Sequence, residues 1–394
     1  MKSLTKIVLA LLFTLWLVPA KAQSYLGQLA LSDSARASLV TCGPGNDFYT
    51  TFGHTAIRVT DPAIHLDLVY NYGTFDFNTP HFYLTFARGK LDYCLSRTDY
   101  RYFMAEYAYE GRWVRQQTLL LSHDEVQRLF CALEENYLEA NRYYRYDLIK
   151  DNCATRARDM IEQCLDPDKP AVATANTEPD RTYRQLLCSY TGRELMWWQF
   201  GVDLLLGQRC DKATDMHERA FLPCELMEQA ALTCRKGATM LPLAASQELL
   251  LDETRTLPNP SVDPSLVFWL FLAAVAALTA WQLRRGFSLN GLDMALFGTA
   301  SLIAVVLVFM WLCTDHYCTK ANWNLLWANP LFIYLLIRWR HPSRWVTLAL
   351  MVMLLVAAGG FALLPQQYNP AVLPIIITLF IRTTARYKLK NHRI

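Results

Sequence analysis

The sequence predicts an α+β domain followed by an all-α transmembrane bundle of about five helices. Residues 23–256 mix charged, aromatic and apolar side chains without a long apolar run, and strand-like patterns alternate with helical ones. From Leu266 onward, apolar blocks recur between short polar or basic clusters. Residues 257–265 contain three prolines and are expected to form an extended linker between the two parts.

The first 22 residues have the features of a secretory signal peptide. Lys2 and Lys6 give a basic start, an apolar stretch covers residues 7–19, and Ala20 and Ala22 are the small residues of a cleavage site. We therefore expect residues 23–256 to fold outside the inner membrane. An uncleaved anchor helix of the same orientation would deliver them to the same side.

The polar part also contains scaffold elements. Residues 82–93 and 113–121 are predicted to be strands that complete a sheet. Ser122 and Glu125 have the spacing of a capping box, and apolar residues follow at helical spacing. The last part of this domain is expected to be helical.

Five apolar segments follow the linker. They cover residues 266–283, 292–313, 325–337, 346–364 and 371–381. The third and fifth are short and contain Pro330 and Pro374, so each is either a crossing or a re-entrant segment. Basic residues follow the first, third and fifth segments, whereas the loops after the second and fourth carry only Lys320. This alternation predicts five crossings that end in the cytoplasm.

Composition excludes some classes of function. A net charge of +3 over 394 residues gives no indication of a nucleic-acid partner. The cysteines number 11, so at least one has no partner within the chain. Without a C-x-x-C motif, neither a redox pair nor a zinc site is supported, and we expect no metal or organic cofactor. Cys313 and Cys318 flank a predicted outer loop and are a candidate disulfide.

A predicted helix carries the first candidate catalytic residue. Apolar residues recur at helical spacing from Cys153 to Leu165, and either Asp151 or Asn152 is suited to the N-cap. Cys153 would lie in the first turn, where the helix dipole and backbone N–H groups favour a thiolate. A cysteine on the core face of a helix is more often a small hydrophobic residue, so this segment alone does not identify a nucleophile.

A second segment supplies a base. Residues 52–59 are predicted to form a strand with His54 at its start, and residues 66–73 are predicted to form a second strand. Asp67 is the candidate that orients the imidazole. The alternatives to Asp67 are His65 and Asn71. A thiol nucleophile requires a base and a third group that fixes the tautomer of this base.

Four motifs together resemble a known family. They are TCGPG at 41–45, FGHTA at 52–56, YNYGTFDF at 70–77 and DNCATR at 151–156. A strand histidine that precedes an Asn-Cys at a helix start is similar to the circularly permuted papain-like fold of NlpC-type and lecithin–retinol acyltransferase-type proteins. With the C-terminal spans, nearly the whole mature chain resembles the Lnb-type lipoprotein N-acyltransferases.

This resemblance implies acyl transfer through a thioester. Cys153 would take an acyl chain from a membrane phospholipid with His54 as its base, and the α-amine of a diacylated lipoprotein would accept the chain. Tyr146 and Asn152 are candidates for the oxyanion side, and the alternatives for them are a packed ring and a helix cap. On the same residues, two other functions are open: a membrane-anchored Cys-His hydrolase, either a cell-wall peptidase or amidase or a phospholipase, and a non-catalytic envelope binding module.

Other polar residues are candidates for substrate contact. Arg58, Arg112 and Arg115 are able to meet a lipid phosphate, and the alternative for each is a surface charge or an internal ion pair. Among these we select Arg58. His316 and Asn322 lie in the predicted outer loop, where polar groups are able to bind a headgroup, although polar residues are ordinary in such a loop.

Overall fold

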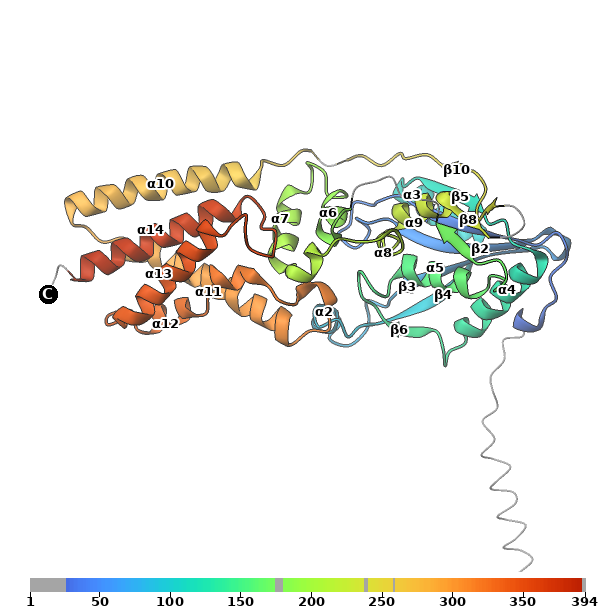
Figure 1. Ribbon diagram of the computed structural model, residues 1–394, viewed down its shortest axis with the longest axis horizontal. Helices are drawn as coiled ribbons and strands as arrows, with labels where there is room; N and C mark the ends of the chain where they lie inside the picture. The colour runs from blue at the N-terminus through green and yellow to red at the C-terminus, as the bar shows by residue number, and fades with distance from the viewer. Residues whose placement is uncertain (1–25, 174–179, 237–239, 258, 392–394) are drawn as a thin grey trace, which may run out of the picture.

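The computed structural model describes residues 26–173, 180–236, 240–257 and 259–391, so the predicted signal peptide lies outside the described residues. The molecule is elongated, with a sheet-containing part and a bundle of helices placed end to end (Figure 1). The last described residues, at the end of α14 (Val372–Asn391), lie at the end of the bundle that is remote from the sheet (Figure 1).

A seven-stranded antiparallel sheet forms the centre of the N-terminal part. In spatial order its strands are β10 (Glu248–Leu251), β5 (Val114–Thr118), β1 (Arg36–Cys42), β2 (His54–Asp61), β3 (Leu66–Thr74), β4 (Asp92–Asp99) and β6 (Tyr143–Arg145). The predicted strands at 52–59 and 66–73 correspond to β2 and β3, and they are paired with each other. The α+β prediction is confirmed, and the strand that begins at His54 precedes the helix that begins at Cys153, in the order expected of the permuted papain-like fold.

Helices cover both faces of this sheet. Side chains alternate along β2, so that Ile57 packs with α4 (His123–Tyr137) and α5 (Cys153–Gln163), whereas Ala56 packs with α3 (Tyr100–Glu110) on the other face. The capping box at the start of α4 is present, since the side chain of Ser122 and that of the third helical residue each bind the backbone N–H of the other.

One predicted strand is wrong in its first half. Residues 82–87 form the helix α2 (Phe82–Ala87), and β4 begins only at Asp92. Gly89 turns the chain between them with a φ of 65°. The ring of Phe82 stacks on Phe75 at a centroid distance of 5.8 Å, so ring packing outweighs the strand propensity of this aromatic segment.

The rest of the N-terminal part is mainly helical. Its elements are η1 (Leu26–Gln28), η2 (Pro62–Ile64), β7 (Ala171–Ala173), α6 (Tyr183–Cys188), α7 (Met196–Leu205), η3 (Gln208–Asp211), α8 (Met216–Arg219), α9 (Pro223–Leu232), β8 (Thr233–Arg235) and β9 (Leu241–Pro242). The strands β7, β8 and β9 form a small separate sheet. In Figure 1, α6 and α7 lie between the large sheet and the bundle.

The bundle contains the predicted apolar segments. Its elements are α10 (Pro264–Arg285), α11 (Asn290–Leu312), η4 (Tyr317–Thr319), η5 (Trp323–Leu326), α12 (Leu331–Ile337), α13 (Arg344–Gly359) and α14 (Val372–Asn391). Among the described residues, α10 and α11 are the two helices long and apolar enough to cross a membrane. The third predicted segment is interrupted at Pro330, which separates η5 from the short α12. Pro374 lies in the first turn of α14, where proline is tolerated, and this helix is longer than the fifth predicted segment.

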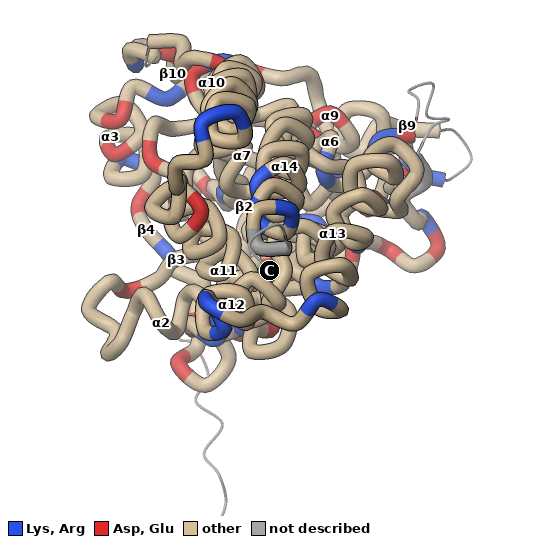
Figure 2. Tube along the Cα trace, turned by 90° about the vertical axis from the view of Figure 1, so that its left-hand side faces the viewer, with Lys and Arg blue, Asp and Glu red and all other residues tan. Residues whose placement is uncertain are grey.

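Basic residues gather at the end of the bundle that is remote from the sheet. Figure 2 looks along the molecule from that end and shows blue segments around α10, α12, α13 and α14. Arg284 lies in the last turn of α10, Arg338 directly follows α12, and the second half of α14 carries Arg382 and Arg386. The sequence pattern of positive charges therefore corresponds to one end of the molecule.

Candidate active site

Asn152 fixes the start of the helix α5. Its side-chain oxygen accepts hydrogen bonds from the backbone N–H groups of Ala154 and Thr155, both at 2.9 Å. Its side-chain nitrogen donates to the carbonyl groups of Leu148 at 2.7 Å and Phe221 at 2.8 Å. Because both ends of this amide are bound, Asn152 serves as a helix cap, and its predicted oxyanion role does not fit the geometry.

Cys153 follows this cap and is largely buried, with 7% of its surface exposed. Burial raises the pKa of its thiol, while the backbone N–H groups of Thr55, Ala154 and Cys153 and the more distant Arg112 oppose this rise. The sequence favoured a thiolate at the helix start, but burial outweighs that effect, so the resting thiol is protonated. Its sulfur lies at the start of β2, bonded to the N–H of the residue that follows His54.

His54 is oriented by Asn71. The Nε2 atom of its ring lies 3.3 Å from the side-chain oxygen of Asn71. The strand register explains the pairing, because Asn71 is opposite Ala56, two residues from His54, whereas Asp67 is opposite Thr60. Six residues of strand separate Thr60 from His54, or about 20 Å. The predicted orienter Asp67 is therefore not at the imidazole, and the alternative residue Asn71 is.

Asp67 and Arg58 bind each other instead. The Nε and Nη2 atoms of Arg58 donate to the two carboxylate oxygens of Asp67 at 2.7 and 2.8 Å. The Nη1 atom of Arg58 donates to Gln116 at 2.8 Å, and its guanidinium lies 3.4 Å from the ring centroid of Tyr100. Arg58 thus forms the internal ion pair that was its alternative interpretation, and it is not available for a lipid phosphate.

A neutral imidazole is the resting form of His54. Burial and the positive charge of Arg112 lower the pKa of His54 from 6.5 to about 4, while the hydrogen bond to Asn71 acts in the opposite direction. The ring also stacks on Tyr107 at a centroid distance of 6.4 Å. Near neutral pH, the imidazole of His54 is therefore unprotonated and able to accept a proton.

Arg112 is a member of this site that the sequence did not distinguish from other arginines. It is 4% exposed, donates from Nε to the carbonyl of Gly43 at 2.7 Å and pairs through Nη1 with Glu110 at 2.8 Å. Its Nη2 atom is buried and has no hydrogen-bond partner among the described residues. Because its charge lowers the pKa of both His54 and Cys153, Arg112 belongs to the same electrostatic unit.

Two tyrosines lie beside Cys153 where the chain turns at Gly73. This glycine has a φ of 93°, and a Cβ added there would lie 3.7 Å from Cβ of Cys153, 3.8 Å from Tyr146 and 4.0 Å from the hydroxyl of Tyr144. The predicted residue Tyr146 is thus close to Cys153, and its ring stacks on Tyr93 at 4.4 Å. The sequence missed Tyr144, the inward residue of β6.

The hydroxyl of Tyr144 is a buried donor without an assigned acceptor. It has no hydrogen-bond partner among the described residues. Burial and the neighbouring Cys153 raise its pKa well above the usual range, so it keeps its proton at neutral pH. A buried hydroxyl that is unpaired at rest is suited to donate a hydrogen bond to an oxyanion that forms during a reaction.

His316 and Asn322 join the outer loop of the bundle to the N-terminal part. Nε2 of His316 lies 3.2 Å from the carbonyl oxygen of Ala87. The amide nitrogen of Asn322 donates to the carbonyl groups of Leu204 at 2.7 Å and Leu205 at 3.1 Å. Both predicted substrate residues therefore form contacts within the protein, and neither has a described contact with Cys153 or His54.

The cysteines of this loop are not bonded to each other. All eleven cysteines are free thiols, and Cys313 is exposed whereas Cys318 is buried. The sulfur of Cys210 lies 3.7 Å from the carbonyl oxygen of Cys318. The predicted Cys313–Cys318 disulfide is therefore absent, and Cys318 packs toward η3 instead.

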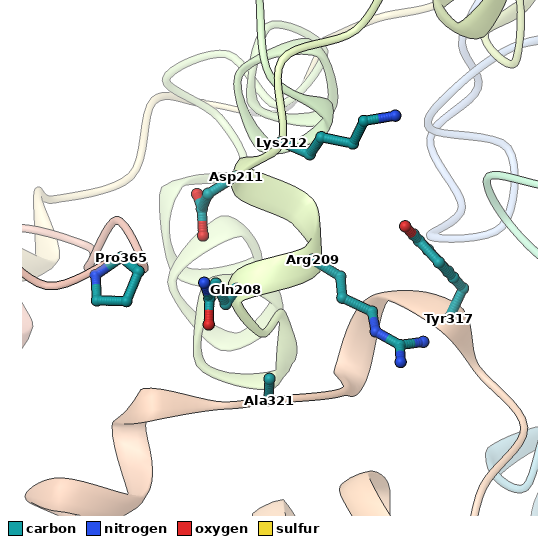
Figure 3. A pocket seen from close by; sticks show the side chains of 7 residues that line it. All are labelled: Gln208, Arg209, Asp211, Lys212, Tyr317, Ala321 and Pro365. Atoms are coloured by element: carbon teal, nitrogen blue, oxygen red, sulfur yellow. The ribbon is translucent and has the colours of Figure 1, made fainter.

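A pocket of about 450 Å³ lies where η3 meets the outer loop. Figure 3 shows its lining, with the side chain of Arg209 extended beside Tyr317. The residues that line it are Gln208, Arg209, Asp211, Lys212, Tyr317, Ala321 and Pro365. None of them is a predicted site residue, and Asp211 is bound to Arg184 at 2.7 Å. The pocket therefore shares no lining residue with the Cys153 site.

Two protein-family models match the chain. The model of the Lnb N-terminal periplasmic domain matches residues 22–188, and the model of the Lnb transmembrane domain matches residues 256–393. Together they cover more than three quarters of the 394 residues, including Cys153, His54 and all five helices of the bundle. No curated protein and no solved structure matches the chain.

Proposed function

The chain belongs to the Lnb family, with a periplasmic N-terminal domain and a membrane domain, and from this we propose that it is a lipoprotein N-acyltransferase. It moves an acyl chain from a membrane phospholipid to Cys153, and from Cys153 to the α-amine of a diacylated lipoprotein. The observation that supports the proposal is the position of the buried free thiol of Cys153, which accepts from the backbone N–H of Thr55, the residue that follows the neutral imidazole of His54.

The first half-reaction forms a thioester. His54 takes the proton of the Cys153 thiol while the sulfur attacks the carbonyl carbon of the phospholipid ester. As negative charge develops on the carbonyl oxygen, the hydroxyl of Tyr144 donates a hydrogen bond to it. When the intermediate collapses, the ester C–O bond breaks, and the lysophospholipid oxygen leaves with the proton held by His54.

The second half-reaction forms an amide. The α-amine of the lipoprotein attacks the thioester carbonyl, and His54 takes the proton that the amine loses. The C–S bond then breaks, the proton passes to the sulfur, and Cys153 returns to its neutral thiol. Asn71 holds the imidazole during both steps through its bond to Nε2, which leaves Nδ1 for proton transfer.

The position in the envelope follows from the charge pattern. We assign the basic end of the bundle to the cytoplasm, because positively charged residues are retained on that side of the inner membrane. Both proposed substrates are lipids held in the membrane, so anchoring the catalytic domain to a bundle shortens their path to Cys153.

Intact-mass analysis tests the thioester. The purified full-length protein is incubated with phospholipid vesicles, and the parent is compared with Cys153→Ala and with Cys42→Ala. Cys42 is a matched control, because it is also a buried free thiol and is paired with His54 across β1 and β2. We expect an adduct of one acyl chain on the parent and on Cys42→Ala, none on Cys153→Ala, and its removal by hydroxylamine.

The acceptor is tested next. Adding a diacylated lipopeptide with a free α-amine is expected to discharge the adduct and yield a triacylated peptide. Release of free fatty acid at the same rate with and without the peptide would instead establish a hydrolase. A folded parent that forms no adduct, even in rapid-quench samples, would refute the acyl-enzyme.

A further inference from the structure

A group of exposed aromatic and apolar side chains lies beside the active site. It combines two residues of the β1–β2 loop, one of the β3–α2 loop and two of α2. We call it the aromatic surface, and its members are Phe48, Tyr49, Phe77, Tyr83 and Leu84, which are 57%, 47%, 58%, 83% and 55% exposed. Exposed apolar groups of this kind mark an interaction site on a protein surface.

The aromatic surface is continuous. The ring of Tyr49 lies 5.5 Å from that of Phe48 and 6.2 Å from that of Phe77, measured between centroids. Phe82 connects Phe77 to Tyr83, at 5.0 and 5.4 Å. Three segments of the chain therefore hold these rings as one patch rather than as scattered side chains.

Its position next to the bundle identifies the partner. The residues that follow α2 contact the chain that leaves α11: the carbonyl of Arg88 accepts from the backbone N–H of Asp315 at 2.9 Å. Gly89 approaches His316 so closely that an added Cβ would lie 3.2 Å from its ring. Asp315 is three residues beyond Leu312, the end of α11, and three residues span at most about 10 Å. Figure 1 shows α2 beside this end of the bundle.

A series of rings continues inward to the catalytic cysteine. Phe75 lies 4.9 Å from Phe77 on the aromatic surface and 5.2 Å from Tyr93. Tyr93 in turn stacks on Tyr146 at 4.4 Å, and Tyr146 lies beside Cys153 at the Gly73 turn. Apolar ring surfaces thus extend without a break from the exposed patch to the nucleophile.

We infer that the aromatic surface inserts into the outer face of the phospholipid bilayer that holds the bundle, and that the rings of Phe75, Tyr93 and Tyr146 lead an acyl chain from it to Cys153. The partner is the lipid itself, because aromatic side chains favour the level of the headgroups and the patch is held next to the end of a membrane helix. Arg88 follows the patch in sequence and supplies positive charge for a lipid phosphate, whereas Lys90 is paired with Asp315 at 4.0 Å. The insertion rests on the membrane domain alone, whereas the destination of the acyl chain rests on the proposed function.

Photo-crosslinking tests the insertion. Benzoylphenylalanine replaces Tyr83 in the full-length protein, which is then reconstituted in nanodiscs of phosphatidylethanolamine and phosphatidylglycerol. The matched control replaces Tyr109, which is 94% exposed on α3, away from the bundle. After irradiation, intact mass is expected to show a phospholipid adduct at position 83 and none at position 109. An absence of adduct at 83, or equal adducts at both positions, would overturn the inference.

A second measurement tests delivery of the chain. Tyr83→Ser with Leu84→Ser is expected to slow acylation of Cys153 by vesicle phospholipid about tenfold, because two apolar anchors are lost. Acylation by a water-soluble short-chain p-nitrophenyl ester should be unchanged. The control pair Tyr102→Ser with Tyr109→Ser, on α3, should behave as the parent with both donors.

The outcomes separate the two proposals. If the parent forms no thioester with either donor, the proposed function fails, and the crosslink at position 83 still decides the insertion. If the parent is acylated and the Tyr83–Leu84 variant keeps the full rate on vesicles, delivery through the aromatic surface is wrong.

Discussion

The two ends of the β2–β3 strand pair carry polar side chains that are used in opposite ways. At one end, Arg58 and Asp67 form a bidentate ion pair that satisfies both groups. At the other end, His54 has a single long hydrogen bond, and the nearby Tyr144 hydroxyl and Arg112 Nη2 have no partner among the described residues. An unpaired buried polar atom costs about 1–3 kcal/mol. Under the proposed function, the unpaired atoms of Tyr144 and Arg112 are available to bind a substrate at the His54 end.

Of the changes at the two ends, removal of the base His54 should have the largest effect on the rate of acylation. We expect His54→Gln to slow thioester formation by about 10²–10⁴-fold, the usual contribution of a general base. The measurement is the initial rate of acyl adduct formation by intact mass. His123→Gln is the control, since Nε2 of His123 lies 3.0 Å from the carbonyl oxygen of Leu31, away from Cys153. Equal rates for His54→Gln and the parent would remove His54 from the mechanism.

Removing the unpaired hydroxyl of Tyr144 is expected to lower the rate less than removing His54 does, and to keep or raise the stability of the protein. Tyr144→Phe should lower kcat about 10²–10³-fold, as for loss of one oxyanion donor. Because this hydroxyl has no partner at rest, the unfolding free energy should stay the same or rise by about 1 kcal/mol. The measurements are adduct kinetics and urea unfolding.

Tyr72→Phe is the matched control for Tyr144→Phe. The hydroxyl of Tyr72 donates to Asn136 at 2.7 Å, so its removal should cost about 1 kcal/mol of stability and leave the rate unchanged. If Tyr144→Phe destabilises the protein and keeps its activity, its hydroxyl has a structural partner instead.

The two candidate orienters give the next contrast. Asn71→Ala should lower kcat about 100-fold, because the imidazole loses its fixed position. Asp67→Ala should leave kcat unchanged and reduce stability by up to about 1 kcal/mol, since the ion pair with Arg58 is partly exposed. Steady-state kinetics and thermal unfolding of both variants measure this. A rate loss in Asp67→Ala that exceeds that in Asn71→Ala would reverse the assignment.

Sequence patterns were sufficient where the decisive interaction is local. The run at 52–59, which turn residues end, predicted β2 with His54 at its start, and helical spacing after a cap at Asp151 or Asn152 predicted α5 with Cys153 in its first turn. They failed where register decides, because Asp67 and Asn71 lie on the same face of β3 and only the pairing with β2 distinguishes them.

Contacts between segments far apart in the chain also could not be predicted from the sequence. Tyr144 lies in the three-residue strand β6, and nothing in its neighbourhood separates it from Tyr146. Asn322 contacts Leu204, 118 residues earlier in the chain, so its predicted role at a lipid headgroup was inferred without its actual partner. The thiolate prediction failed for a related reason, since burial depends on the whole fold.

The smallest expected effect is a shift in the pH dependence of the acylation rate. It tests whether the charge of Arg112 acts on His54. His54 must be neutral to accept a proton, so the acylation rate should rise as pH increases through about 4 and stay level across neutral pH. Arg112→Met removes a positive charge that lowers the pKa of His54. The acid limb of the rate profile should therefore move to higher pH, while burial still keeps it below 6.5.

Two variants serve as controls for this measurement: a conservative change at Arg112 and a charge removal at the nearby Arg115. Arg112→Lys retains the charge and should leave the acid limb close to that of the parent, even where the loss of the bond to Gly43 lowers the rate. Arg115→Met removes the next arginine of the same segment, whose guanidinium lies 4.9 Å from the ring centroid of Trp113, and should not shift the limb. A shift shared by Arg112→Met and Arg115→Met would reflect general surface charge, because of these two arginines it is Arg112 whose charge lowers the pKa of both His54 and Cys153.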